Sequence, residues 1–189
     1  MKYYIVKYTG QFGFIKPWSA VRDSQTFSQQ FLTPSIVEGI EKKLFPELLN
    51  EKGIFKIKRN KLSYSSMSSQ QEVTQPRGWN KKSKSMERFR SILVRDVMVN
   101  PVLVLAFEKE EEALSASKQH ICLCRNEDVM LPDPLVVEMT DEEFNDLKGF
   151  ELRFGESDSS FLVGYNRFNE SEPMYGRIEF DGKSILENE

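Results

Sequence analysis

Histidine and cysteine are scarce in this chain of 189 residues, and this limits the chemistry it can carry. The single histidine is His120, and the two cysteines are Cys122 and Cys124. Proton transfer near neutral pH is most often carried out by histidine, so His120 is the one candidate of that type. A zinc site needs four ligands around the metal, which three residues at alternating positions of one short segment do not supply. We therefore expect no metal and no cofactor. For His120 we favour the interpretation as an ordinary strand residue over that as a catalytic residue.

Long apolar runs and signature loops are also missing. The sequence has no Gly-rich phosphate loop, nucleophile elbow or dinucleotide fingerprint. No run approaches the ~20 apolar residues of a membrane span, and residues 2–9 are typical of a strand and not of a signal peptide. Two cysteines this close along one strand are not expected to form a disulfide. We therefore expect a cytoplasmic protein with neither a membrane nor a small-molecule partner.

Basic charge is concentrated in one stretch of an otherwise acidic chain. Residues 52–95 contain twelve Lys and Arg against two acids, whereas the rest of the chain contains fourteen basic and twenty-seven acidic residues. A net charge near zero therefore hides about +10 in one segment and about −13 elsewhere. A polyanion would be attracted to the basic segment, so nucleic acid is the leading partner. A solvated, lysine-rich loop without a ligand is the alternative.

The first third of the chain predicts a strand, a helix and a second strand. Residues 2–9 are rich in aromatic and β-branched side chains and predict the first strand. A long loop over 10–33 precedes a helix over 34–43, for which Thr33 is a suitable N-cap and proline a suitable first residue. Residues 54–64 alternate apolar and basic, which is typical of a half-buried strand.

A polar excursion then separates this strand from the longest apolar stretch. Residues 65–85 are rich in Ser, Gln and Lys and predict a flexible or hairpin-like excursion. Residues 88–107 predict one long bent strand or two strands, with Asn100 and Pro101 at the bend. Asp96 is an acid inside this hydrophobic stretch, and we expect it to form a structural ion pair with an arginine.

The remaining elements are short. Residues 109–119 predict a helix whose acidic start and lysine near its end suit the helix dipole. Strands are predicted at 121–124 and 135–139. Thr140 can cap a helix over 141–148 through a capping box, and short aromatic strands follow in the tail.

The order of these elements predicts an α+β fold. Strand, helix, strand, inserted hairpin and strand, followed by a second helix and strand, is compatible with a split-βαβ, ferredoxin-like (RRM-like) sheet, an arrangement that often binds RNA. We expect this domain over residues 1–120, with a basic β-hairpin inserted at about 65–87. A small β-rich C-terminal region, residues 121–189, would pack on it.

Three stretches resemble one family of proteins. Residues 31–44, FLTPSIVEGIEKKL, are similar to the first helix of the RAMP superfamily of CRISPR-associated proteins, with its Thr-Pro-Ser start and a glycine a few residues on. Residues 53–62, GIFKIKRNKL, resemble a second strand that ends in an Arg-Asn pair. Residues 88–107 resemble a long strand in which an Arg-Asp-Val tripeptide follows a basic run. Together they resemble the Cas-five family, most closely its type I-C branch, over roughly residues 2–107.

The resemblance implies an RNA-binding subunit of a CRISPR effector complex. In this family the ferredoxin-like domain binds the 5′ handle of the guide RNA (crRNA), and a hairpin thumb contacts the neighbouring backbone subunit. The excursion at 65–85 takes the position of the thumb. Guide RNA and the backbone subunit are therefore the expected partners, with a large subunit as a further candidate.

The resemblance also bears on catalysis. The type I-C branch cleaves its own precursor RNA without metal, using a tyrosine just after the first helix and a Lys-His pair further on. Phe45, which has no hydroxyl, stands at about the tyrosine position, and the nearest counterparts of the pair are Lys118 and His120. We therefore expect no catalytic residues and a non-catalytic function. The alternatives are a metal-independent endoribonuclease and a protein-interaction domain with a basic hairpin.

The candidate RNA-binding residues are basic, aromatic or hydroxyl-bearing. Basic side chains would neutralise phosphates, Trp79 would stack on a base, and groups near Thr33 would hold splayed nucleotides. The alternatives are a solvated face for the basic residues of 54–64, a protein contact for Trp79, and packing on the sheet for Trp18 and Arg22. The full set is Trp18, Arg22, Thr33, Ser35, Lys56, Lys58, Arg59, Lys61, Arg77, Trp79, Lys81, Lys82, Lys84, Arg88 and Arg90.

Overall fold

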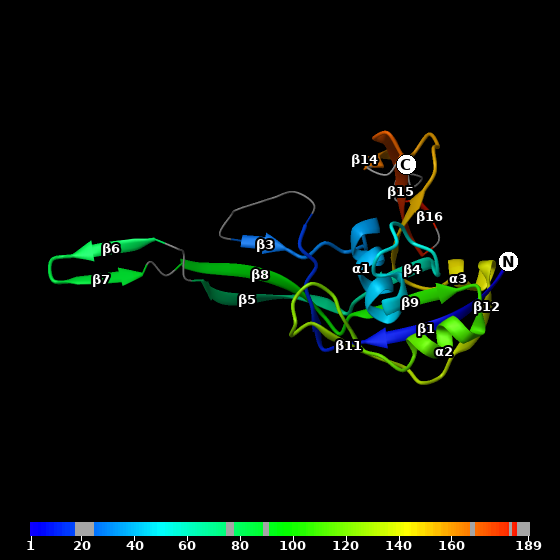
Figure 1. Cartoon of the computed structure of the whole chain (residues 1–189), viewed down its shortest axis with the longest axis horizontal. Coiled ribbons are helices and arrows are strands. Elements are labelled where there is room, and N and C mark those ends of the chain that lie inside the picture. Colours follow the sequence, from blue (N-terminus) through cyan, green and yellow to red (C-terminus); the bar gives the residue numbers. More distant parts are fainter. Residues whose placement is uncertain (18–24, 75–77, 89–90, 167–168, 182, 185–189) are drawn as a thin grey trace.

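The computed structural model describes residues 1–17, 25–74, 78–88, 91–166, 169–181 and 183–184. It consists of a body, in which short helices pack on a sheet, and a long arm that projects from the body (Figure 1). The chain is rich in strands and has few helices, which confirms the expected α+β class. Within the described ranges, no helix is both long and apolar enough to cross a bilayer.

The body is built on one antiparallel sheet. Its strands lie in the order β10-β11-β1-β9-β4-β13-β15-β14, with β12 also beside β1 and β16 beside β15. β1 and β9 pair at its centre, from Tyr4 opposite Phe107 to Thr9 opposite Val102. The strands of this sheet are β1 (Lys2–Thr9), β4 (Ile57–Ser63), β9 (Val102–Phe107), β10 (Ile121–Cys122), β11 (Val129–Pro132), β12 (Val137–Thr140), β13 (Phe150–Phe154), β14 (Phe161–Asn166), β15 (Glu172–Phe180) and β16 (Lys183–Ser184).

Helices cover both faces of the central strands. Helix α1 (Pro34–Leu44) and helix α2 (Glu110–Ala116) contribute to the larger apolar cluster, which includes Val6, Leu105 and Phe107. On the opposite face, Phe144 of helix α3 (Asp141–Asn145) packs with Tyr3 and Ile5. Burial of these apolar side chains is the main stabilising term of the body.

The helices begin within one residue of their predicted starts, but α2 ends at Ala116, before the predicted residue 119. Thr33 is the N-cap of α1 in an extended conformation, although its side chain forms no capping bond, and a short 3₁₀ helix η1 (Pro46–Leu48) follows. Both hydrogen bonds of the predicted capping box are present between Thr140 and Glu143. Helix α3 ends at Asn145, earlier than predicted, and Gly149 with φ of 136° begins the turn into β13.

The arm is a two-stranded antiparallel ribbon with a second hairpin at its end (Figure 1). β5 (Ser66–Thr74) and β8 (Ser91–Val99) pair along their full length, and β6 (Trp79–Lys82) pairs with β7 (Ser85–Arg88) at the tip. Short strands β2 (Phe12–Gly13) and β3 (Gln25–Phe27) pair with β8. Asn100, with φ of 50°, separates β8 from β9.

Two features differ from the sequence expectations. The described part of the apolar stretch from Ser91 to Phe107 forms two strands, β8 and β9, which is the second of the two alternatives, and β8 belongs to the arm and not to the body sheet. The loop predicted over 10–33 contains β2 and β3. Strands on both sides of residue 120 join one sheet, since β11 and β12 pair with β1. The division of the chain at residue 120 stays a prediction.

Candidate nucleic-acid interface

The tip of the arm exposes basic and aromatic side chains. The turn between β6 and β7 contains Ser83 and Lys84. Lys81 and Lys84 are exposed, and Trp79 is 53% exposed. Because the tip lies at the far end of the arm from the body, a partner can reach it without touching the sheet (Figure 1).

The tip hairpin brings together part of the predicted RNA-binding set. The predicted residues in β6, β7 and their turn are Trp79, Lys81, Lys82, Lys84 and Arg88. Four other predicted residues, Trp18, Arg22, Arg77 and Arg90, lie outside the described residues. The position of the hairpin at the end of a ribbon, and not its composition alone, makes the basic cluster accessible.

An ion pair links the two long strands of the arm, β5 and β8. Arg95 Nε donates a hydrogen bond to Glu72 Oε2 at 3.1 Å. Asp96 is 4% exposed and accepts hydrogen bonds from Gln25 Nε2, at 2.9 Å, and from the hydroxyl of Ser69. Neutral donors from both neighbouring strands are the partners of this buried carboxylate within the described ranges. The expected ion pair of Asp96 with an arginine stays a prediction, because not every arginine of the chain has a described side chain.

Arg59 on β4 does not face solvent. It is 5% exposed, and its guanidinium donates to Glu151 at 3.0 and 2.5 Å and to Asp141 at 2.8 Å. Burial works against the charge, but the hydrogen bonds and charges of Glu151 and Asp141 raise the pKa of Arg59 above its ordinary value. Its donors are engaged inside the protein, which argues against the predicted contact of Arg59 with RNA phosphates.

Lys61 is also buried. It is 0% exposed, and its Nζ donates to the carbonyl oxygens of Asn145, at 2.6 Å, and Leu147, at 2.7 Å, at the end of α3. Burial lowers the pKa of Lys61. These carbonyls, at and just after the C-terminus of α3, occupy the ammonium group, which argues against the predicted phosphate contact of Lys61 as well.

The other two lysines of this segment lie at the surface and contact acids. Lys58 is exposed, with its Nζ 3.4 Å from Glu108. Lys56 Nζ contacts Glu47 at 2.5 Å and lies 3.9 Å from the centre of the Phe45 ring. Exposed pairs of this kind contribute little stability, so a phosphate could replace either acid.

A groove lies beside the start of α1. Its cavity volume is about 370 Å³, and its walls come from α1, from the segment before β4 and from the β14–β15 hairpin. Thr33 and Ser35 form one wall, and Tyr165, 62% exposed, forms the other. The predicted residues Thr33 and Ser35 therefore lie next to an aromatic ring on which a base could stack.

At the position that the resemblance assigns to the nuclease site, the end of α1 carries a buried apolar side chain and no hydroxyl group. Phe45 is 3% exposed and packs edge-on against Phe107, with 6.0 Å between ring centres. Gln119 Nε2 donates to Leu44 O at 3.2 Å, which holds the Lys118–His120 segment near the end of α1, and His120 is exposed. Among the described residues, no group of His, Cys, Asp and Glu has an arrangement suited to a metal ion.

Comparison with known proteins gives a likeness of fold. No family model matches the chain. No curated protein matches it either. A chain of a solved structure described as "CRISPR RNA-guided surveillance complex" is similar, with a TM-score of 0.51 and 12% sequence identity, over 97% of this chain and 92% of that chain. This chain therefore has the fold of a component of that complex.

Two residues of the interface region, Glu41 and Tyr165, were not identified from the sequence. Glu41 is 0% exposed, and its carboxylate accepts the backbone N–H groups of Phe55, Lys56 and Ile57 at 2.6–2.8 Å, which fixes the segment that borders the groove. Its spacing from Ile40 and Leu44 on the buried face of α1 was a usable signal. Tyr165 had none, because its place depends on strand pairing across the chain.

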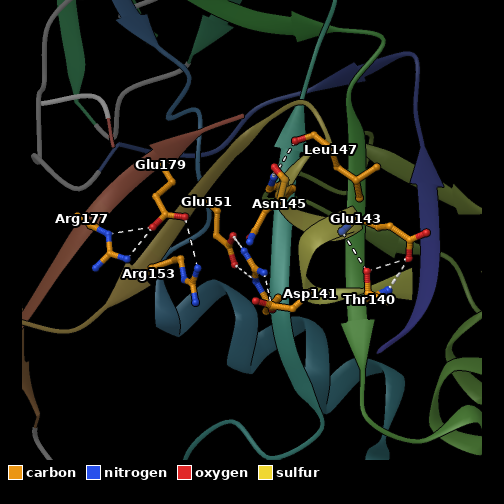
Figure 2. Close-up of polar contacts among 11 residues, drawn as sticks. Thr140, Asp141, Glu143, Asn145, Leu147, Glu151, Arg153, Arg177 and Glu179 are labelled. Carbon is orange, nitrogen blue, oxygen red and sulfur yellow. Dashed lines mark hydrogen bonds and ion pairs between the residues drawn. The ribbon is translucent and has the colours of Figure 1, made fainter. Parts of the chain in front are cut away.

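A row of charges crosses β13 and β15 on the face opposite α1. Figure 2 shows Arg153 and Arg177 pointing toward Glu179, and Glu151 and Asp141 lying beside them. Glu179 is 4% exposed and is satisfied by both arginines. Through the pair of Glu151 with Arg59, this network joins the C-terminal strands to β4. The main role of these ionised groups is therefore to stabilise the fold.

Proposed function

We propose that this chain is a non-catalytic RNA-binding subunit of a CRISPR effector complex, which caps the repeat-derived 5′ handle of the guide RNA. The observation that carries the proposal is the arm, a basic-tipped hairpin inserted between two central strands of a body whose fold resembles that of a CRISPR surveillance-complex chain. The tip would contact the neighbouring backbone subunit or its RNA. The body would hold the handle, with a cytoplasmic location.

We infer that the central strands form a ferredoxin-like split-βαβ sheet. In chain order the elements are β1, α1, β4, the arm, β9, α2 and the strands β11 and β12. In space the strands lie in the order β11, β1, β9, β4, all antiparallel. This interleaved order supports membership of the RAMP superfamily, and the motifs described above support its Cas-five family.

The groove beside α1 is the proposed place for part of the handle. It combines the exposed ring of Tyr165 with the exposed residue Ser35, whose hydroxyl lies 3.1 Å from that of the buried Thr33. Single-stranded RNA is recognised mainly by stacking of unpaired bases and by contacts to phosphate and 2′-OH groups. Lys58 and the tip lysines would supply the salt-dependent part of the affinity.

Absence of catalysis is part of the proposal. The support is the buried Phe45, which brings no hydroxyl to the end of α1. The alternative is a metal-independent endoribonuclease that uses His120. Incubation of the purified protein with precursor RNA in EDTA separates the two, because the proposal predicts intact RNA. Cleavage that is lost in His120→Ala would establish the alternative.

RNA binding itself is tested by fluorescence anisotropy. A single-stranded RNA with the repeat-derived 5′ end should bind, with an affinity that falls steeply as salt rises. Tyr165→Ala should weaken binding about tenfold, the scale of one lost stacking contact, whereas Tyr175→Ala, at another exposed tyrosine of the same hairpin, should not. No binding of any RNA at low salt would favour the protein-interaction domain.

A further inference from the structure

We propose that the gap between β4 and β13 is a pocket for one RNA base that carries an exocyclic amino group, and that Asn60 reads this group. The inference rests on the proposed RNA-binding function and adds a specificity-determining residue to it. It concerns the Arg-Asn pair of β4, of which Arg59 is already engaged in an internal ion pair.

The gap arises because the sheet opens between these two strands. Among the described residues, β4 and β13 pair at a single position, Leu62 opposite Phe150. Gly149, with φ of 136°, allows this close approach, since a Cβ there would lie 2.9 Å from Leu62 O. Beyond that point the strands separate around a cavity of about 380 Å³. This volume lies toward the lower end of the ~300–1,000 Å³ typical of small-ligand sites.

Asn60 is the unexplained polar group of this cavity. Its Oδ1 atom is buried and accepts no hydrogen bond from the described residues. Its strand neighbours on either side, Arg59 and Lys61, have protein partners, and Leu62, two residues on, lies in the apolar core. A buried acceptor without a partner destabilises the protein, so a donor from a ligand or water at this position would be favourable.

The groups around Asn60 suit a nucleotide. Phe154, 50% exposed, forms part of the wall and offers a ring for stacking. Lys58 and Arg153 also line the cavity, and their ion pairs, at 3.4 and 3.6 Å, are long enough to exchange for a phosphate. An asparagine amide can pair with the amino group and the adjacent acceptor of adenine, and a carbonyl oxygen with no other donor selects for that amino group.

The test removes the amino group from the RNA and its partner from the protein. Anisotropy at one salt concentration compares a short oligomer of adenosine with one of purine riboside, which lacks the 6-amino group. The wild-type chain should bind the adenosine oligomer about tenfold more tightly, the scale of one base contact. Asn60→Leu should bind both with the weaker affinity, while its thermal midpoint stays equal to or above that of the wild type.

The control is Lys58→Ala, which should weaken both oligomers by the same factor and reduce the salt slope by about one unit. Equal affinity of the wild-type chain for the two oligomers would overturn the pocket but leave RNA binding intact. Binding of neither would overturn the proposed function as well. If Asn60→Leu does not fold, the wild-type comparison decides alone, because it needs no variant. An Asn60→Leu protein that keeps the tenfold preference would also overturn the assignment.

Discussion

Arg59 illustrates how a residue that looks like a surface charge becomes part of the core. Its guanidinium lies between Glu151, 3% exposed, and Asp141, and 4.4 Å from the ring centre of Phe144. Two bonds to one carboxylate give the pair a fixed geometry. Loss of one partner would leave the other charge buried without compensation, which is far more costly than loss of the pair as a whole.

Glu151→Ala should therefore lower the free energy of unfolding by about 3–5 kcal/mol, the range for breaking a buried pair. Chemical denaturation monitored by circular dichroism measures this. The matched control is Glu138→Ala, which removes an exposed partner of Lys2 and should cost no more than about 1 kcal/mol. Equal effects of the two substitutions would mean that Arg59 is not buried as described.

Asp141 gives this network a dependence on pH. Burial would raise its pKa, but the charge and hydrogen bond of Arg59 hold the pKa of Asp141 below its ordinary value. An acid with a depressed pKa stabilises the fold fully above its unfolded pKa, about 3.9, and loses that contribution as the pH falls through the folded value. Asp141→Asn should therefore be less stable than the wild type at pH 7, and the difference should shrink below about pH 4. A difference that stays constant from pH 7 to strongly acidic conditions would contradict this.

For single residues, the sequence pattern did not predict which charged side chains face solvent and which are buried. Alternation along 54–64 indicated a strand with basic residues on its wet face. A β-bulge between Ile57 and Arg59 changes the register, and partners about 80 to 90 positions away cover Arg59 and Lys61. Neither the bulge nor these contacts leave a local signal. The sequence singled out Asn60 as part of the Arg-Asn pair, but it did not predict that Asn60 Oδ1 would lack a hydrogen-bond donor among the described residues.

At the scale of elements, the arm is the feature most directly tied to binding. Its strands pair along their full length, so it holds the tip hairpin away from the body (Figure 1). The sequence predicted a hairpin at 65–87 from composition. It did not predict that β8, which ends just before the expected bend at Asn100, belongs to the arm, because a run of apolar residues is equally compatible with a core strand.

Simultaneous replacement of Lys81, Lys82 and Lys84 by Glu should weaken RNA binding or complex assembly by at least tenfold at moderate salt, because several phosphate contacts would become repulsive. Anisotropy and gel filtration with the partner subunits measure this. The control replaces Lys109, Lys118 and Lys148, all exposed on the body, and so changes net charge equally. Equal losses in both variants would show that total charge, and not the tip, drives binding.

Helix α3 depends on its capping box more than a longer helix would. It has five residues, and Thr140 and Glu143 exchange both capping bonds (Figure 2). Thr140→Ser should be nearly neutral, whereas Thr140→Ala should cost about 1 kcal/mol of unfolding free energy. Lys61 Nζ donates to Asn145 O at the end of α3, and this contact depends on the helix being formed. The Ala variant, in which the helix frays, should therefore also lose amide-exchange protection around Asn145. Unchanged protection would mean that tertiary packing alone holds the helix.

At the scale of the whole molecule, charge segregation and shape agree. The basic segment forms β4 and the arm, and the acidic excess lies in the remaining residues. The order of elements was readable from periodicity, whereas the joining of C-terminal strands β13–β15 to β4 was not, because strand pairing between distant segments has no local sequence code. At 12% identity, the likeness to the surveillance-complex chain is carried by the fold and not by the sequence.

The most direct test of the central claim is to purify the tagged chain from its own host and to sequence the RNA that stays bound, with 5′ ends mapped. The account predicts guide RNAs that share one repeat-derived 5′ end and that remain bound at moderate salt. The absence of RNA, or a random mixture lost at moderate salt, would contradict it and would favour a protein partner for the arm.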